Sequence, residues 1–183
     1  MFTHADLDGL ASIFSDPLVM KYLGTGEPVS REETETALTS IIRHWHRHGF
    51  GRWAVVHKED DSLIGYGGLR WLEGVGPELV YLLAQPYWGM GLATEIARAC
   101  LRYGFELRQF DSIVAIAKPP NIASRRVMEK VGMSYEKQAT YFNIDVVQYT
   151  ISRDQYRPDD LTYILHDVFE SEAGSSAAES SLA

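Results

Sequence analysis

The chain has 183 residues, with 17 basic and 25 acidic side chains and a net charge of -8. This length fits one domain that can bury its own core, and the apolar fraction of 45% is ordinary for a globular protein. The acidic balance argues against nucleic acid as the main partner. No apolar run is long enough for a membrane span, and the N-terminus lacks the features of a signal peptide. We therefore expect a soluble cytoplasmic protein, in which the lone Cys100 has a packing role.

Two helices are predicted before residue 50. Apolar residues from Leu7 to Phe14 have helical spacing, and the helix stops at Asp16-Pro17 because proline disfavours helix in the preceding residue. Ser30-Arg-Glu-Glu33 has the form of a capping box, and the helix that it opens is expected to end at Gly49. The segment 20–29 between them is broken by glycine and proline, so we expect a loop near the substrate entrance.

Three histidines lie in the last turns of the second helix. His44 and His48 are four residues apart, a spacing at which two imidazoles can share a metal ion. The alternative, which we favour, is a polar helix end with imidazoles near the negative end of the dipole. We therefore predict no metal.

The centre of the chain predicts a strand, a glycine turn and a helix. Leu79–Leu83 is apolar at every position, so both faces of this strand should be covered, with Glu78 at its edge. Gly89 and Gly91 bracket a turn before a helical apolar pattern. The unpaired N–H groups and the positive dipole at a helix N-terminus favour phosphate or pyrophosphate. The turn lacks the Gly-Lys-Ser/Thr of a Walker loop and the third small residue of a dinucleotide fingerprint.

The other strands complete an α/β sandwich, a mixed sheet with helices on both faces. A strand at 111–117 and a helix beginning at Asn121 follow the central helix, as in a parallel crossover unit. The remaining strands are predicted at 52–57, 63–69, 134–143 and 145–152. We expect residues 1–157 to form the domain, 158–170 to add a helix, and 171–183 to be disordered.

Two motifs resemble the GCN5-related N-acetyltransferase (GNAT) superfamily. Trp88-Gly-Met-Gly-Leu-Ala93 is similar to its acetyl-coenzyme-A loop, Arg/Gln-x-x-Gly-x-Gly/Ala, with Trp88 in place of Arg or Gln. The segment 121–133 resembles the asparagine-led helix of the same family, and the segments 17–24 and 48–54 resemble the branch that includes the ribosomal-protein N-terminal acetyltransferases. The likeness covers about residues 5–157. It implies a mostly antiparallel twisted sheet whose central strands splay at the coenzyme site. The family's first edge strand is missing, or the start site is truncated.

The resemblance also implies where the co-substrate acetyl-CoA binds. It places the pyrophosphate on the backbone of the glycine turn and the pantetheine beside the end of the central strand, where the N–H of Leu83 or its neighbour donates to the carbonyl oxygen. Each of three residues has an alternative role. Asn121 could be only the helix N-cap, and Arg125 could be a solvated side chain. For Trp88 the alternative is a packing role, and for this residue we favour it. The expected coenzyme contacts are Leu83, Trp88, Gly89, Met90, Gly91, Leu92, Ala93, Thr94, Asn121 and Arg125.

Acetyl transfer to an amine requires a base, because a lysine amine has a pKa of about 10.4 and an α-amine about 7.7 to 8. The family commonly has an acidic residue on the central strand, so Glu78 is the predicted base, with a surface carboxylate as the alternative. Ser124 is predicted to protonate the thiolate or to hold the pantetheine, with Tyr141 and Tyr149 as rivals. The amine attacks directly within a ternary complex.

These residues predict an acetyl-CoA-dependent N-acetyltransferase that acts on a primary amine. Protein N-termini, polyamines and amino sugars remain open as acceptors, and so do a monomer and a homodimer. The segments 20–29 and 31–49 should wall the acceptor site, and four glutamates there either attract a cationic amine or form a solvated face: Glu27, Glu32, Glu33 and Glu35. The rivals are a non-catalytic acyl-CoA sensor or scaffold and a metal-dependent protein that uses the histidines.

Overall fold

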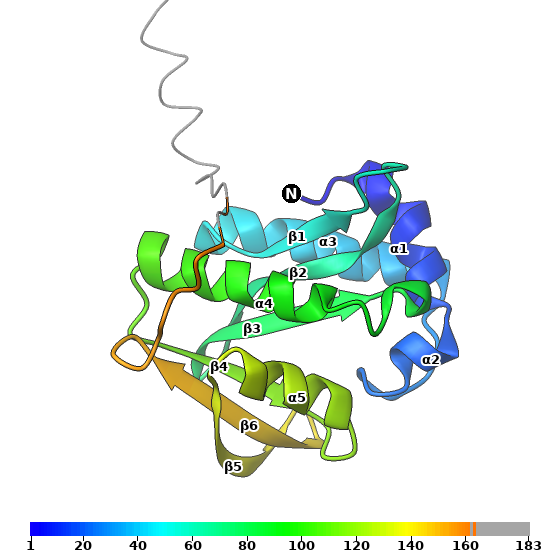
Figure 1. The fold of residues 1–183 in the computed structure, drawn as a ribbon. Helices are drawn as coiled ribbons and strands as arrows, with labels where there is room; N and C mark the ends of the chain where they lie inside the picture. Colours follow the sequence, from blue (N-terminus) through cyan, green and yellow to red (C-terminus); the bar gives the residue numbers. More distant parts are fainter. Residues whose placement is uncertain (162, 164–183) are drawn as a thin grey trace, which may run out of the picture.

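The computed structural model describes residues 1–161 and 163, and it shows one mixed sheet with helices on both faces (Figure 1). The strand order is β1-β2-β3-β4-β6-β5, and every neighbouring pair is antiparallel except β3 and β4. This arrangement confirms the predicted fold class. The strands are β1 Arg52–Val56, β2 Leu63–Leu72, β3 Gly76–Leu83, β4 Ser112–Ala117, β5 Ser134–Tyr141 and β6 Ile144–Ser152.

The helices lie in two layers, with α1–α3 on one face of the sheet and α4 and α5 on the other (Figure 1). The predicted capping box opens α3, since the Ser30 hydroxyl accepts from the Glu33 N–H and Gly49 ends the helix in a left-handed conformation. The bounds are α1 Leu7–Phe14, α2 Pro17–Met20, α3 Arg31–His48, α4 Leu92–Arg102 and α5 Ile122–Lys130, with a π-helical turn at Tyr103–Leu107.

Each face of the sheet has its own apolar core. Leu10, Leu38 and Leu82 are buried between the sheet and α1–α3, and Leu101 and Met128 are buried beneath α4 and α5. The α4 helix packs very close to β2 at Gly67. A Cβ atom added to this glycine would lie 2.0 Å from a methyl carbon of Ile96, so a larger residue would have to displace Ile96. The central helix is therefore fixed directly on the sheet.

The two ends of the chain concern the family's missing first strand and the predicted C-terminal helix. Residues 1–6 contain a 3₁₀ turn, His4–Asp6, and no strand, so β1 is the edge of the sheet at this side. The helix predicted at 158–170 falls mostly outside the described residues, and the described residues within it, 158–161 and 163, are not helical. The tail at 171–183 lies outside them entirely. No helix in the described part of the chain is long and apolar enough to cross a bilayer.

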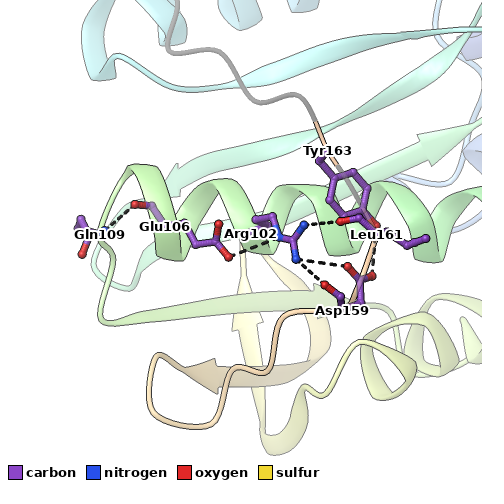
Figure 2. A network of polar contacts seen from close by, with 6 residues as sticks. All are labelled: Arg102, Glu106, Gln109, Asp159, Leu161 and Tyr163. Atoms are coloured by element: carbon purple, nitrogen blue, oxygen red, sulfur yellow. Dashed lines mark hydrogen bonds and ion pairs between the residues drawn. The ribbon is translucent and has the colours of Figure 1, made fainter.

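The chain after β6 returns along α4 and is attached there through Arg102 (Figure 2). The Arg102 guanidinium donates to the carbonyl oxygens of Asp159 (2.6 Å) and Leu161 and forms an ion pair with Glu106. The Tyr163 hydroxyl donates to the Asp159 carboxylate at 3.3 Å. These contacts hold the segment against the end of α4 that lies far from the glycine turn.

Candidate active site

The site is built around an opening between β3 and β4. The two strands are bridged at one position among the described residues, Glu78 opposite Val114, and diverge beyond it. A cavity of about 760 Å³ lies at this opening and reaches both faces of the sheet. The Ala84 N–H donates to the Ile64 carbonyl on β2, so ladder alternation directs the N–H of Leu83 away from β2 and toward the opening. The end of β3 thus offers a backbone donor to the cavity.

The glycine turn forms one end of the cavity. Gly91 is the N-cap of α4 with φ +84°, and its carbonyl accepts from the N–H groups of Thr94 and Glu95. The N–H groups of Leu92 and Ala93 precede the first helical bond, as required for an anion site. The predicted coenzyme residues Gly89, Gly91, Leu92, Ala93 and Thr94 line the cavity, whereas the Met90 side chain is 64% exposed and lies outside its lining.

Trp88 connects the glycine turn to the strand. Its indole N–H donates to the Leu83 carbonyl at 2.7 Å, and the residue lines the cavity. The indole therefore fixes the turn to the end of β3 by a hydrogen bond, which adds a specific contact to the packing role expected from the sequence.

The α5 side of the cavity carries two hydroxyl groups. The Tyr81 oxygen lies 3.0 Å from Ser124 Oγ, and the phenol also donates to the Ser124 carbonyl at 3.0 Å. Burial raises the pKa of Tyr81 to about 12, against a smaller opposing effect of the Ser124 hydrogen bond, so the phenol is protonated at neutral pH. Asn121 caps α5, because its side-chain oxygen accepts from the Ser124 N–H at 3.1 Å, and it also lines the cavity.

Glu78 lies within β3 and not at its edge, which corrects the sequence expectation. It is 2% exposed, and both of its carboxylate oxygens accept from Arg70 on β2, at 2.6 and 3.1 Å. The surface-carboxylate alternative is therefore wrong. Each oxygen retains a lone-pair site beyond the ion pair, and Glu78 lines the cavity, so a water or an amine can reach it.

The other predicted catalytic side chains are divided between the two faces of the sheet. Tyr141 lines the cavity, and its hydroxyl donates to Gln148 at 2.5 Å. Tyr149 is buried on the opposite face beneath α5, where it donates to Glu129 at 3.0 Å and accepts from Arg125 Nε at 3.2 Å. The structure therefore brings neither Tyr149 nor Arg125 into the cavity lining.

His44 has a structural role. Its Nδ1 lies 2.9 Å from the Phe50 carbonyl, and its Nε2 accepts from the Trp71 N–H at 2.9 Å. Burial, followed by the nearby His48, Arg52 and Arg70, lowers the pKa of His44 to about 4, although the Phe50 carbonyl opposes this shift. Both ring nitrogens are thus occupied by the backbone. Within the described residues there is no cluster of three or more metal-ligating side chains.

The two segments predicted to wall the acceptor site both reach the cavity. Met20 at the end of α2 lines it together with Tyr22 and Leu23, and α3 contributes Ala37 and Ile41. The four glutamates of this region are not in the lining, and Glu33 instead accepts from the Ser30 N–H. Sequence reasoning missed Arg52, Arg70 and Tyr81. Their signal was a charged or hydroxyl side chain within an otherwise apolar strand.

Comparison with known proteins assigns the family. Residues 1–134 match the family model described as acetyltransferase (GNAT) domain, and the chain belongs to this family. An uncharacterized protein of Bacillus subtilis, YkkB, is 35% identical over 148 residues, which are 79% of this chain and 84% of that protein.

Solved structures have the same fold. A GNAT-family acetyltransferase from Bacillus anthracis has a TM-score of 0.70 and 26% identity, over 84% of this chain and 92% of its own. A structure of AAC(6')-Ib with paromomycin and acetyl-CoA has a TM-score of 0.72 at 20% identity, over 85% and 92% of the two chains.

Proposed function

We propose that this protein transfers the acetyl group of acetyl-CoA to a primary amine by direct attack in a ternary complex. The observation that carries the proposal is a cavity that reaches three features: the glycine turn, the end of β3 where it is no longer bridged to β4, and the buried Glu78. Membership of the acetyltransferase family and the coenzyme complex of a protein with the same fold support this assignment.

The coenzyme is held mainly by backbone groups in this proposal. Its pyrophosphate accepts from the N–H groups at the start of α4, where the helix dipole is positive. The Leu83 N–H donates to the thioester oxygen, whose negative charge grows as the amine attacks, and loss of one such donor costs about two to three orders of magnitude in rate. Asn121 and Trp88 shape the channel between these two points.

Proton transfers at both reactants complete the reaction. Glu78, through its lone-pair sites beyond Arg70, takes the first proton from the ammonium either directly or through water. Ser124 then protonates the departing thiolate, and the neutral Tyr81 phenol, 3.0 Å away, replaces the Ser124 proton. The nitrogen loses its second proton as the amide forms, and that proton restores the phenol through water. Tyr141 lies on the acceptor side, where it orients the amine, with its hydroxyl held by Gln148.

The test is thiol release from acetyl-CoA in the presence of a panel of amines, with mass spectrometry of the products. We expect release that depends on the amine, and an N-acetylated product. Calorimetric binding of coenzyme A without any thiol release would instead support the sensor or scaffold, and an absence of binding would refute both functions.

A further inference from the structure

The cavity wall carries an unexpected charge for an acidic chain. The net charge of the protein is -8, yet the charged side chains that line the cavity are Arg52, Arg70, Lys118 and Lys130 against Glu78. The one acid is already paired with Arg70. The coenzyme phosphates account for part of this charge, but on the face of Glu78 the Arg52 side chain adds a positive charge beyond the Arg70–Glu78 pair, which disfavours a polyamine and favours an anionic group there.

Among the described residues, the cavity cations without an ion pair are Arg52, Lys118 and Lys130. Arg52 is the one on a strand, on the same face of the sheet as Glu78. Its Nε is buried and has no hydrogen-bond partner, and no ion pair of its guanidinium is found among the described residues. The guanidinium lies over the Tyr66 ring, 5.3 Å from the ring centroid. Burial lowers the pKa of Arg52 from its usual range. Arg70 adds to this pKa shift, whereas Tyr66 and Glu78 oppose it, and the group stays cationic at neutral pH. The residue as a whole is half-buried, and its enclosed Nε lacks an acceptor, a cost that a ligand accepting there would remove.

The position of Arg52 relates it to the reacting amine. Arg52 on β1 is opposite Gly68 on β2, which is opposite Val80 on β3, so all three belong to one row across the sheet. Val80 shares its face with Glu78 and Leu82, the acceptor side of the opening. Two strand spacings, about 10 Å, separate the backbones of Arg52 and β3, and the long arginine side chain spans much of this distance. An anion on Arg52 thus lies a few bonds from an amine near Glu78.

We propose that Arg52 binds an anionic oxyacid group of the acceptor, and that the acceptor is a small primary amine carrying a carboxylate or phosphate. This inference rests on the proposed function, because it assigns the acceptor class of the same site. The planar guanidinium suits either group, since both can accept two parallel hydrogen bonds.

Matched substrates separate the anion from the rest of the molecule. Glycine, β-alanine and γ-aminobutyrate are compared with their amides and with aminoalkylphosphonates of equal length, at saturating acetyl-CoA. We expect kcat/KM for the best anion to exceed that of its amide by about tenfold or more, as for a hydrogen bond to a charged group. Preference for carboxylates or for phosphonates identifies the oxyacid. Equal values for anions and amides throughout the panel would overturn the proposal.

Variants assign the preference to one side chain. Arg52→Gln should reduce the anion-to-amide ratio to about twofold or less, and Arg52→Lys should retain part of it. Arg31→Gln is the control, since Arg31 is an exposed arginine that pairs with Asp8 outside the cavity. If Arg52→Gln lowers kcat/KM for anions and amides equally, Arg52 is not the anion site.

Two further measurements do not depend on turnover. Arg52→Met should change the Tm of the free protein little, because a half-buried cation without an ion pair is removed and the stem packing is kept. A fall of several degrees would make Arg52 structural and end the proposal. Calorimetry with coenzyme A and N-acetyl-β-alanine, or its amide, tests the anion subsite directly. If the wild type binds the anion, Arg52→Gln does not, and the wild type releases no thiol, the transferase function is refuted but the anion subsite is kept. If acetyl transfer occurs without a preference for anions, the subsite is refuted and the transferase function is kept.

Discussion

Protonation of His44 should destabilise the protein progressively below neutral pH. The folded-state pKa of about 4 lies below the ordinary value of 6.5, so the unfolded chain binds the proton first as the pH falls. The stabilising contribution is fully present above about pH 6.5 and is lost toward pH 4. Between about pH 7.5 and about pH 5, the two pKa values imply a loss of about 2 kcal/mol in the free energy of unfolding. Because the ring is partly exposed, we expect about 1 kcal/mol of this loss.

The assay is urea unfolding of wild type and His44→Gln at these two pH values. Subtracting the two proteins cancels the carboxylates that titrate in both. The advantage of wild type over His44→Gln should shrink by about 1 kcal/mol at the lower pH. His46→Gln, an exposed histidine on the same helix, is the control and should show no such change. If the wild-type and His44→Gln stabilities fall in parallel, burial does not hold His44 neutral in the folded protein.

The other predictions concern the proposed reaction. Gly91→Val should abolish coenzyme binding measured by calorimetry, because valine does not tolerate φ +84°; Gly74→Val, with φ +76° and equally open space, should lower stability but leave coenzyme affinity unchanged. Trp88→Arg should keep coenzyme affinity within a few-fold, because arginine can still donate to the Leu83 carbonyl. Trp88→Phe cannot donate there and should weaken coenzyme binding by about three- to tenfold. A loss of affinity of about tenfold in Trp88→Arg would show that the indole itself is needed. Glu78→Gln should lower kcat by about two orders of magnitude with little change in coenzyme affinity, provided that circular dichroism shows a folded protein. The defect in kcat should shrink as the pH rises. Parallel pH profiles of wild type and variant from about pH 6 to 10 would argue against Glu78 as the base. Tyr81→Phe and Ser124→Ala should each lower kcat by about ten- to a hundredfold, and the double variant should be little worse than either one, since both act in one proton path; additive effects would separate them.

Local signals in the sequence were sufficient for most of the fold. The capping box at Ser30 and the left-handed Gly49 define α3 within a residue, and Gly91 defines the start of α4, because caps and positive φ angles depend on residues close in the chain. The opening between β3 and β4 followed only from the family resemblance, since no periodicity records where two strands part.

The errors at the site concern contacts between distant residues. Arg70 pairs with Glu78 because β2 and β3 form a hairpin in that register, and the sequence alone made Glu78 look like a strand end. Tyr149 follows the buried Gln148 on a strand that is buried on both faces, so alternation does not say which of the two points toward α5. The charge of Arg52 in an apolar strand was visible in the sequence, but its lack of an ion pair becomes visible only once the neighbours are placed.

The single bridge between Glu78 and Val114 makes the sheet nearly two half-sheets, β1–β3 and β4–β6–β5, joined by the core beneath α4. Most backbone hydrogen bonds that would tie adjacent strands together are missing at this seam, so the two halves are free to exchange amide hydrogens as separate cooperative units. A ligand that lies in the opening contacts both halves at once. Amides of β4 and β6 should therefore exchange at a different rate from those of β2 in the free protein, and coenzyme A should bring the two rates together by making the domain unfold as one unit.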